Sequence, residues 1–308
     1  MKWTKSSRHW NWRSGKRSTT NAKSNLFNAP CANSAVLPVV AITAISDSKL
    51  DDIACTEVIE SPRSRNRPRT RSCEPLISAA LHLRSSLNRL CFSPPVTHVL
   101  NPLDYAWPAH ELYLRRYGSR PRRVVFLGMN PGPFGMLQTG VPFGEINAVR
   151  DWLGIHAPIG RPDTEHPKRP VTGFDCLRSE VSGRRLWGLF EERFGTPKKF
   201  FENHFVLNYC PLAFMEETGR NRTPDKLPAR EQIALFAACD VYLRAAIEFL
   251  APEWIVGVGD FAATRAKTVF AGARIKVVRI LHPSPANPAA NRAWAAVVTR
   301  QLTEARIW

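Results

Sequence analysis

Apolar and polar positions alternate with a regular spacing from about residue 75 onward. Apolar side chains recur at helical intervals between Leu76 and Leu90, which predicts an opening helix. Four short apolar runs follow, separated by segments long enough to form helices. These runs span Val124–Met129, His204–Leu207, Trp254–Val258 and Val277–Leu281. Strands that alternate with helices predict an α/β fold, in which helices cover both faces of a parallel sheet.

Residues typical of helix ends divide the second half of the chain. The sequence predicts a helix with Pro228 in its first turn that runs to about Leu250. Asp260 is predicted to cap a helix that stops near Gly272. Asn287–Pro288 is predicted to supply the cap and first turn of the last helix.

Residues 1–74 differ from the rest of the chain, because they are rich in Ser, Asn, Arg and Lys and have no sustained helix or strand period. They are predicted to be a disordered basic extension, followed by one catalytic domain over residues 75–308. Two interpretations of the extension stay open: a real tail that adds affinity for phosphates, or an over-long gene prediction. The second requires a non-AUG start, since no Met lies between Met1 and Met129. The extension contains a basic run at Arg63, Arg65, Arg67, Arg69 and Arg71.

The charge balance favours a polyanionic partner. Lys and Arg number 43 against 26 Asp and Glu, which gives a formal net charge of +17. The seven cysteines form no CxxC pair and no metal-ligand cluster, so we expect free thiols in a reducing compartment and no zinc or iron–sulfur centre. The longest apolar run, Ser34 to Ile45, is interrupted by Pro38 and is too short to cross a bilayer. We therefore expect no membrane partner.

The residues that follow the four predicted strands are the first candidates for a site, because ligands of open parallel sheets bind beyond the carboxyl ends of the strands. No carboxylate pair, Ser/His/Asp triad or metal motif assembles there. Two asparagines, a histidine and the nearby Phe143 remain, and these suit recognition of a planar heterocycle and stabilisation of a leaving anion. The strand ends read Asn130–Gly135, Asn208–Pro211, Gly257–Gly259 and His282–Pro285.

The pattern Gly257-x-Gly259-x-x-Ala262 follows a strand and opens a helix, as a dinucleotide-binding fingerprint does. That fingerprint needs an Asp or Glu about 20 residues later for the ribose, and the sequence there is Val278–Leu281. Close packing of strand against helix is therefore the favoured explanation of the glycines.

Several motifs resemble the single-strand-selective monofunctional uracil-DNA glycosylases, in order, from about Leu76 to the end of the chain. The resemblance implies a three-layer α/β/α sandwich with a small, mostly parallel four-stranded sheet, typical of the uracil-DNA glycosylase superfamily. It also implies no metal, no cofactor and no covalent lysine intermediate. The matching segments are Gly128–Met136, Gln138–Glu145, Arg150–Gly154, Glu165–Val171, Asn208–Leu212, Gly219–Pro224 and His282–Pro288.

The resemblance assigns catalytic roles to Asn130 and His282. Asn130 matches the residue that orients the attacking water, and His282 matches the donor to uracil O2, with the Met129 backbone N–H as a second donor. The alternatives are that Asn130 only shapes the turn before Pro131, and that His282 is a packed or surface residue.

Three further residues match positions that bind the base. Asn208 would pair with uracil N3–H and O4, and Phe143 would stack on the ring, although a core position is the alternative for this aromatic residue. Gly132 would keep the pocket wall open beside C5, in accord with a family that also accepts 5-hydroxymethyl- and 5-formyluracil.

The segment from Pro283 to Asn291 matches the wedge that enters the helix where the base leaves. Ala286 departs from the family, because relatives often have a bulky Arg there. A smaller wedge predicts weak action on paired uracil. The predicted DNA-binding residues are Pro283, Ser284, Pro285, Ala286, Asn287 and Asn291.

Together these features predict a monomeric DNA repair enzyme that releases uracil from single- and double-stranded DNA without lyase activity. The expected location is the cytoplasm or nucleoid of a bacterium, or the nucleus of a eukaryote. Two alternatives stay open: a hypoxanthine- or xanthine-DNA glycosylase of the same superfamily, and a non-catalytic DNA-binding protein.

Overall fold

The computed structural model describes residues 72–308. The predicted basic extension lies outside the described residues, except for its last three positions, and the expected domain boundary near residue 75 stays a prediction. Among the described residues, no helix combines the length and apolar character needed to span a bilayer.

A four-stranded parallel sheet forms the centre of residues 72–308. Its strands are β2 (Val124–Gly128), β3 (His204–Asn208), β6 (Trp254–Val258) and β7 (Lys276–Ile280), in the order β3-β2-β6-β7. Each strand lies within one residue of its predicted bounds. The prediction of a small parallel four-stranded sheet is therefore confirmed.

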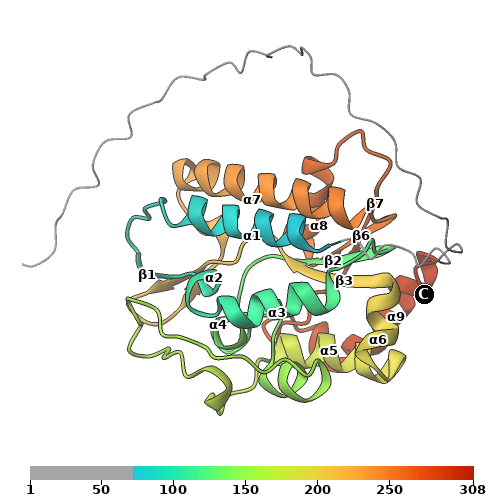
Figure 1. Cartoon of the computed structure of the whole chain (residues 1–308), viewed down its shortest axis with the longest axis horizontal. Helices are drawn as coiled ribbons and strands as arrows, with labels where there is room; N and C mark the ends of the chain where they lie inside the picture. Colours follow the sequence, from blue (N-terminus) through green and yellow to red (C-terminus); the bar gives the residue numbers. More distant parts are fainter. Residues whose placement is uncertain (1–71) are drawn as a thin grey trace, which may run out of the picture. The chain divides into compact units, whose positions relative to one another are not determined.

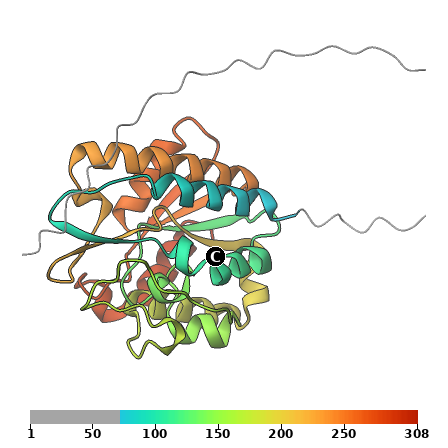
Figure 2. The ribbon, with the colours of Figure 1, turned by 60° about the vertical axis from the view of Figure 1, so that its left-hand side comes forward.

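Helices cover both faces of this sheet, as the alternating pattern predicts (Figures 1 and 2). One layer contains α1 (Glu74–Leu87), α7 (Ala229–Leu250) and α8 (Asp260–Val269). The other contains α3 (Trp107–Tyr117), α5 (Val181–Phe194), α6 (Pro197–Asn203) and α9 (Ala290–Glu304). The short elements between them are α2 (Pro102–Tyr105), α4 (Met136–Thr139), η1 (Ala148–Trp152), η2 (Gly173–Asp175) and η3 (Pro224–Lys226).

A second sheet, which the sequence analysis did not predict, contains three short strands. These are β1 (Val96–Leu100), β4 (Ala213–Glu216) and β5 (Asn221–Arg222), paired antiparallel in the order β1-β4-β5. The strands β4 and β5 form a hairpin that begins five residues after β3 ends. The hairpin is consequently anchored close to the carboxyl edge of the central sheet.

Two predicted helix caps are wrong. Asp260 is the first residue of α8 rather than its cap, and its carboxylate pairs with Arg279 of β7 at 2.5 Å. The cap position belongs to Gly259, whose φ of +92° favours glycine. α9 begins at Ala290 with Ala289 in the cap position, and Asn287 lies in the preceding turn, where its Oδ1 accepts from the Ala289 N–H.

The two glycines at the end of β6 serve packing, as expected. A Cβ at Gly257 would collide with the backbone of Ala263 in α8, and a Cβ at Gly259 would lie 3.2 Å from Cβ of His282. Glycine at these positions lets α8 and the end of β7 approach β6 closely.

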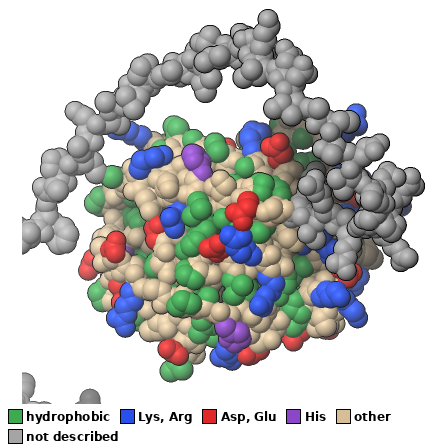
Figure 3. Space-filling model, viewed as in Figure 1, with side chains coloured by type: hydrophobic (Ala, Val, Ile, Leu, Met, Phe, Trp, Pro, Cys, Tyr) green, Lys and Arg blue, Asp and Glu red, His purple; other side chains and the backbone are tan. Residues whose placement is uncertain are grey.

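Charges are mixed on the face of the molecule drawn in Figure 3. Lys and Arg side chains are interspersed there with Asp and Glu, over the layer of α1 and α7 and below it. This face shows no continuous basic surface that would suit a polyanion.

Buried histidines make the fold sensitive to acid. His204 is almost fully buried, its Nδ1–H donates to the Phe200 carbonyl (2.9 Å), and Trp308 Nε1–H donates to its Nε2 (3.3 Å). Burial lowers the pKa of His204 to about 4, whereas an exposed histidine in the unfolded chain titrates near 6.5. The stabilisation is therefore complete above about pH 6.5 and is lost as the pH falls from 6.5 toward 4, because only the unfolded chain binds the proton in that window.

Urea unfolding between pH 7.5 and 4.5 tests this expectation. His204→Gln removes the titrating group, so its free energy of unfolding should fall less steeply than that of the wild type as the pH is lowered. The two slopes should differ by up to about 1.4 kcal/mol per pH unit. Parallel pH dependences in the two proteins would contradict the burial argument.

Candidate functional site

One cavity of about 210 Å³ lies at the carboxyl ends of the central strands. Its wall contains all six residues predicted to bind or cleave the base, together with Ser284 of the predicted wedge. They are Met129, Asn130, Gly132, Phe143, Asn208 and His282. The loops after β2, β3 and β7 thus converge as the parallel topology predicts. A larger cavity of about 670 Å³, lined in part by Asn88 and Asp104, contains none of the six.

His282 follows β7 and presents one ring nitrogen as a donor. The Ser284 backbone N–H donates to its Nδ1 (3.1 Å), so the ring proton resides on Nε2. Burial lowers the pKa of His282 to about 4, which keeps the imidazole neutral at pH 7. The ring lines the cavity with its centroid 6.4 Å from that of Phe143.

Asn130 is oriented by a backbone carbonyl. Its Nδ2–H₂ group donates to the Leu212 carbonyl (3.2 Å), which leaves Oδ1 as an acceptor on the half-buried side chain. The bond fixes the amide at the cavity wall, and whether Asn130 does more than shape its turn stays a prediction. Such an oxygen can hold a water molecule in one place.

Asn208 ends β3 and is only 7 % exposed. Its Nδ2 lies 3.3 Å from the Met136 sulfur, a weak acceptor, and its Oδ1 is buried without a hydrogen-bond partner among the described residues. An unpaired buried carbonyl is costly, so this atom is suited to accept from an N–H group of a ligand.

Phe143 has an unusual backbone for an aromatic residue. Its φ is +53°, in the left-handed region, and the turn is closed by hydrogen bonds from Gly144 N–H to the Val141 carbonyl and from Glu145 N–H to the Phe143 carbonyl. Such strain occurs mostly at functional sites. The ring is half-buried, lines the cavity and also packs against the hydrophobic core, so the stacking role stays a prediction.

Gly128 leaves room for both side chains that would contact the base. A Cβ at this position would collide with Asn208 Oδ1 and lie 2.7 Å from Phe143 Cζ. The end of β2 must therefore be glycine for Asn208 and Phe143 to occupy adjacent places.

The structure adds cavity residues to which the sequence analysis assigned no role. Glu180, the residue before α5, lines the wall, and burial raises the pKa of its carboxyl although the N–H groups of Phe134 and Ser182 oppose this. A Cβ at Gly132 would collide with this carboxylate, so the neighbour that requires glycine here is Glu180. From the sequence, Gly132 was instead expected to leave space beside C5 of the uracil ring. Glu180 is 50 residues from Asn130, and no local pattern marks it. The other additions are Pro131, Gly135, Met136, Ser182, Asn221 and Thr223.

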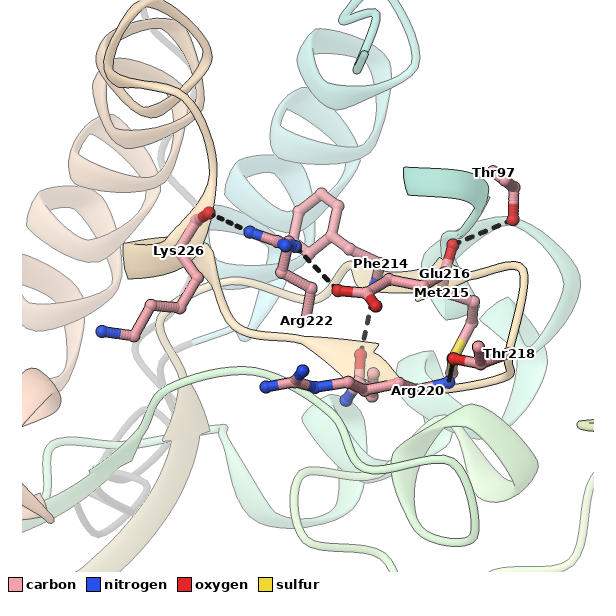
Figure 4. A network of polar contacts seen from close by, with 9 residues as sticks. Thr97, Phe214, Met215, Glu216, Thr218, Arg220, Arg222 and Lys226 are labelled. Atoms are coloured by element: carbon pink, nitrogen blue, oxygen red, sulfur yellow. Dashed lines mark hydrogen bonds and ion pairs between the residues drawn. The ribbon is translucent and has the colours of Figure 1, made fainter. Parts of the chain in front are cut away.

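Asn221 in β5 connects the second sheet to the site. Its Nδ2–H₂ group donates to the Pro131 carbonyl (2.8 Å), and its Oδ1 accepts from Phe214 N–H (3.3 Å). The hairpin is held by the ion pair of Arg222 with Glu216 (3.0 Å), shown in Figure 4. The only sign in the sequence was that Asn221 belongs to the Gly219–Pro224 motif.

The predicted wedge is only partly exposed. Pro283 is buried and its carbonyl accepts from Arg185 Nη1 (2.8 Å), whereas Pro285, Ala286 and Asn291 are exposed. Asn291 Oδ1 accepts from Arg185 Nη2 (3.0 Å) and its Nδ2 donates to the Pro285 carbonyl (2.9 Å). Arg185 of α5 therefore supports the loop whose tip carries Ala286, and Asn287 forms the turn described above. Contact of these residues with DNA stays a prediction.

The arrangement can bind a planar heterocycle and assist a leaving anion. It combines a neutral imidazole donor, an unpaired amide carbonyl, an aromatic ring and an acceptor for water. Among the described residues, no three His, Cys, Asp or Glu side chains group as metal ligands.

Comparisons with known proteins agree with this geometry. The sequence profile of the uracil DNA glycosylase superfamily matches residues 116–303. The single-strand selective monofunctional uracil DNA glycosylase of Mus musculus is 48 % identical over 240 residues, which cover 77 % of this chain and 86 % of that protein. The Bos taurus protein of the same name is 47 % identical over 253 residues, covering 82 % and 90 %.

A solved structure shares the fold. The wild-type SMUG2 protein of Pedobacter heparinus superposes with a TM-score of 0.56 at 17 % identity, covering 74 % of this chain and 97 % of that one. At this identity the likeness concerns the fold alone. From the profile match and the extent of the mammalian matches, we conclude that the chain belongs to the uracil DNA glycosylase superfamily, and within it to the single-strand selective monofunctional uracil DNA glycosylases.

Proposed function

We propose that this protein hydrolyses the bond between uracil and deoxyribose in DNA and leaves an abasic site. The observation that carries the proposal is the buried, unpaired Oδ1 of Asn208 in the cavity wall. Uracil offers N3–H to this oxygen and O4 to the Nδ2–H₂ group. Cytosine offers the opposite polarity, so it would leave buried polar groups unpaired.

The other cavity residues support hydrolysis of that bond. An unstacked uracil would enter the cavity and stack on Phe143. The C1′–N1 bond breaks with its electron pair moving to uracil, and His282 Nε2–H donates to O2, where negative charge collects. A water held by Asn130 Oδ1 forms the new bond to C1′, and the proton that it loses neutralises the uracil anion. No covalent enzyme intermediate is needed, in accord with a monofunctional glycosylase.

Two finer features belong to the proposal. Single-stranded uracil is the preferred substrate, because the exposed loop tip carries the small Ala286, which supports an extruded base poorly. Uracils with a polar group at C5, such as 5-hydroxymethyluracil, are additional substrates, as the resemblance to the family implies.

Base release from oligonucleotides of one sequence context tests the proposal. Uracil, 5-hydroxymethyluracil, hypoxanthine and xanthine are each placed at the same position, in single strands and in duplexes at physiological salt. Uracil should be released, and strand breaks should require the alkali step. Single strands should react several-fold faster than duplexes, and Ala286→Arg should narrow that difference.

Each other result has a distinct meaning. Faster release of hypoxanthine or xanthine would support the alternative glycosylase. DNA binding without release of any base would support a non-catalytic binder, and strand breaks before alkali would reveal lyase activity. Equal rates on single strands and duplexes would refute the role given to Ala286.

A further inference from the structure

Four basic side chains from three segments lie beside the cavity, and we call them the basic strip: Lys168, Arg169, Arg178 and Arg220. Lys168 and Arg169 are neighbours in the sequence, whereas Arg178 and Arg220 come from later segments, and contacts with Phe134 and Gly219 bring the four together. The Arg178 and Arg169 guanidinium carbons lie 4.2 and 5.6 Å from the Phe134 ring centroid. A Cβ at Gly219 would lie 3.3 Å from Lys168 Cβ and 3.7 Å from Arg169 Cζ, and Arg220 follows Gly219 directly.

The basic strip forms no ion pairs with acidic side chains in the described part of the chain. Within residues 72–308, none of its four side chains forms an ion pair with a carboxylate. The contrast with Arg222 is direct, because Arg222 pairs with Glu216 at 3.0 Å and donates to the Lys226 carbonyl at 2.6 Å. In Figure 4 the guanidinium of Arg220 points away from this network and makes no marked contact. Several positive charges are thus gathered without an ion-pair partner among residues 72–308.

The strip adjoins the cavity at two places. Phe134 lies between Gly132 and Gly135, which both line the cavity, and Arg220 directly precedes the lining residue Asn221. An aromatic ring under a guanidinium holds it flat and leaves its N–H edge available to an oxyanion.

Gln138 fixes the segments that carry the strip. Its Nε2–H₂ group donates to the carbonyls of Pro133 and Pro170, both at 3.0 Å, and its Oε1 accepts from Thr172 N–H at 2.9 Å. The segment with Phe134 and the segment with Arg169 therefore keep their relative places. Little conformational entropy would be lost when an anion binds.

We infer that the basic strip binds backbone phosphates of the DNA strand next to the nucleotide whose base enters the cavity. The inference rests on the proposed function, and DNA is the partner that combines a base for the cavity with a row of anions beside it. Arginine pairs with phosphate through two parallel N–H groups, which positions the strand as well as attracting it.

Salt dependence separates this role from a structural one. With a single-stranded uracil oligonucleotide, Arg178→Gln should raise KM about tenfold at low salt and leave kcat unchanged. The slope of log(kcat/KM) against log[salt] should become shallower by about 0.7 for each phosphate contact removed, and by about twice that in the Arg178→Gln/Arg220→Gln double variant. Inhibition by free uracil should not change, since the cavity is intact.

Arg244→Gln is the matched control. Arg244 of α7 also lies over an aromatic ring, with its guanidinium carbon 5.9 Å from the Phe270 centroid, at the far end of α8 from the cavity. The Arg244→Gln variant should have the same KM and the same salt slope of kcat/KM as the wild type.

Unchanged salt slopes in both strip variants, or a fall in kcat at constant KM, would overturn the inference. A wild type that releases no uracil would instead overturn the proposed function. The strip would then be tested by binding of a uracil-free single strand at several salt concentrations. The dissociation constants of the strip variants should still depend less steeply on salt than that of Arg244→Gln.

Discussion

His282→Ala is expected to lower kcat for uracil release by about 10²–10³-fold, with a much smaller change in KM. The Nε2–H group donates where charge develops on uracil O2, so it contributes mainly in the transition state. The Ser284 N–H holds the ring in the required tautomer, and the lowered pKa keeps it neutral. Single-turnover release from a single-stranded oligonucleotide measures the effect.

The pH profile is a second readout of the same group. Because the pKa of His282 is lowered to about 4, the imidazolium should form only as the pH approaches 4. The wild-type rate should therefore show no titration of His282 near pH 6.5, the value for an exposed histidine. His204→Gln is a suitable control, since it removes another buried histidine, at the opposite end of β3 from Asn208. A rate that changes with a midpoint near pH 6.5 and loses this change in His282→Ala would contradict the neutral imidazole.

Asn208→Ala is expected to lower kcat/KM for uracil roughly 10³-fold. Two hydrogen bonds to the base edge are lost, and each is worth about 1–3 kcal/mol when the groups are buried, while 1.36 kcal/mol corresponds to a factor of ten in rate. Discrimination between uracil and cytosine should fall as well, because the polarity of the amide provides it. Rates on oligonucleotides with uracil or cytosine at one position measure both effects.

Asn88→Ala provides the control for this variant. Asn88 is an exposed amide that lines the larger cavity, where its Nδ2 donates to Asp104 at 2.9 Å. Its loss should not alter uracil release. If Asn208→Ala retained wild-type kcat/KM, the base would not be bound by this amide.

The central sheet could be predicted because its strands coincide with short apolar runs, which are uninterrupted in β2 and β6 and broken only by Arg279 in β7. Strands buried on both faces, such as β2, are apolar along their length, and in β3 the apolar run of Phe205, Val206 and Leu207 ends at the first polar residue that follows it. That residue is Asn208 at the end of β3, and Asn130 lies two positions after the end of β2. The same polarity change located the candidate site.

The second sheet and its contribution to the site could not be predicted in the same way. β5 has only two residues, Asn221 and Arg222, and both are polar. Its place depends on pairing with β4 and on the bond from Asn221 to Pro131, which are contacts distant in sequence. The two incorrect caps have a related cause, because Asp260 found a tertiary partner in Arg279 and Asn287 was taken up by a local turn.

The collision that any Cβ at Gly128 would cause sets a limit on how this enzyme can diversify. Any side chain at the end of β2 would displace Asn208 or Phe143 from the cavity wall, so this position accepts only glycine. New substrate preferences are therefore expected to arise from substitutions in the loops around the cavity, such as the one that carries Gly132, whereas the spacing between Asn208 and Phe143 stays constant.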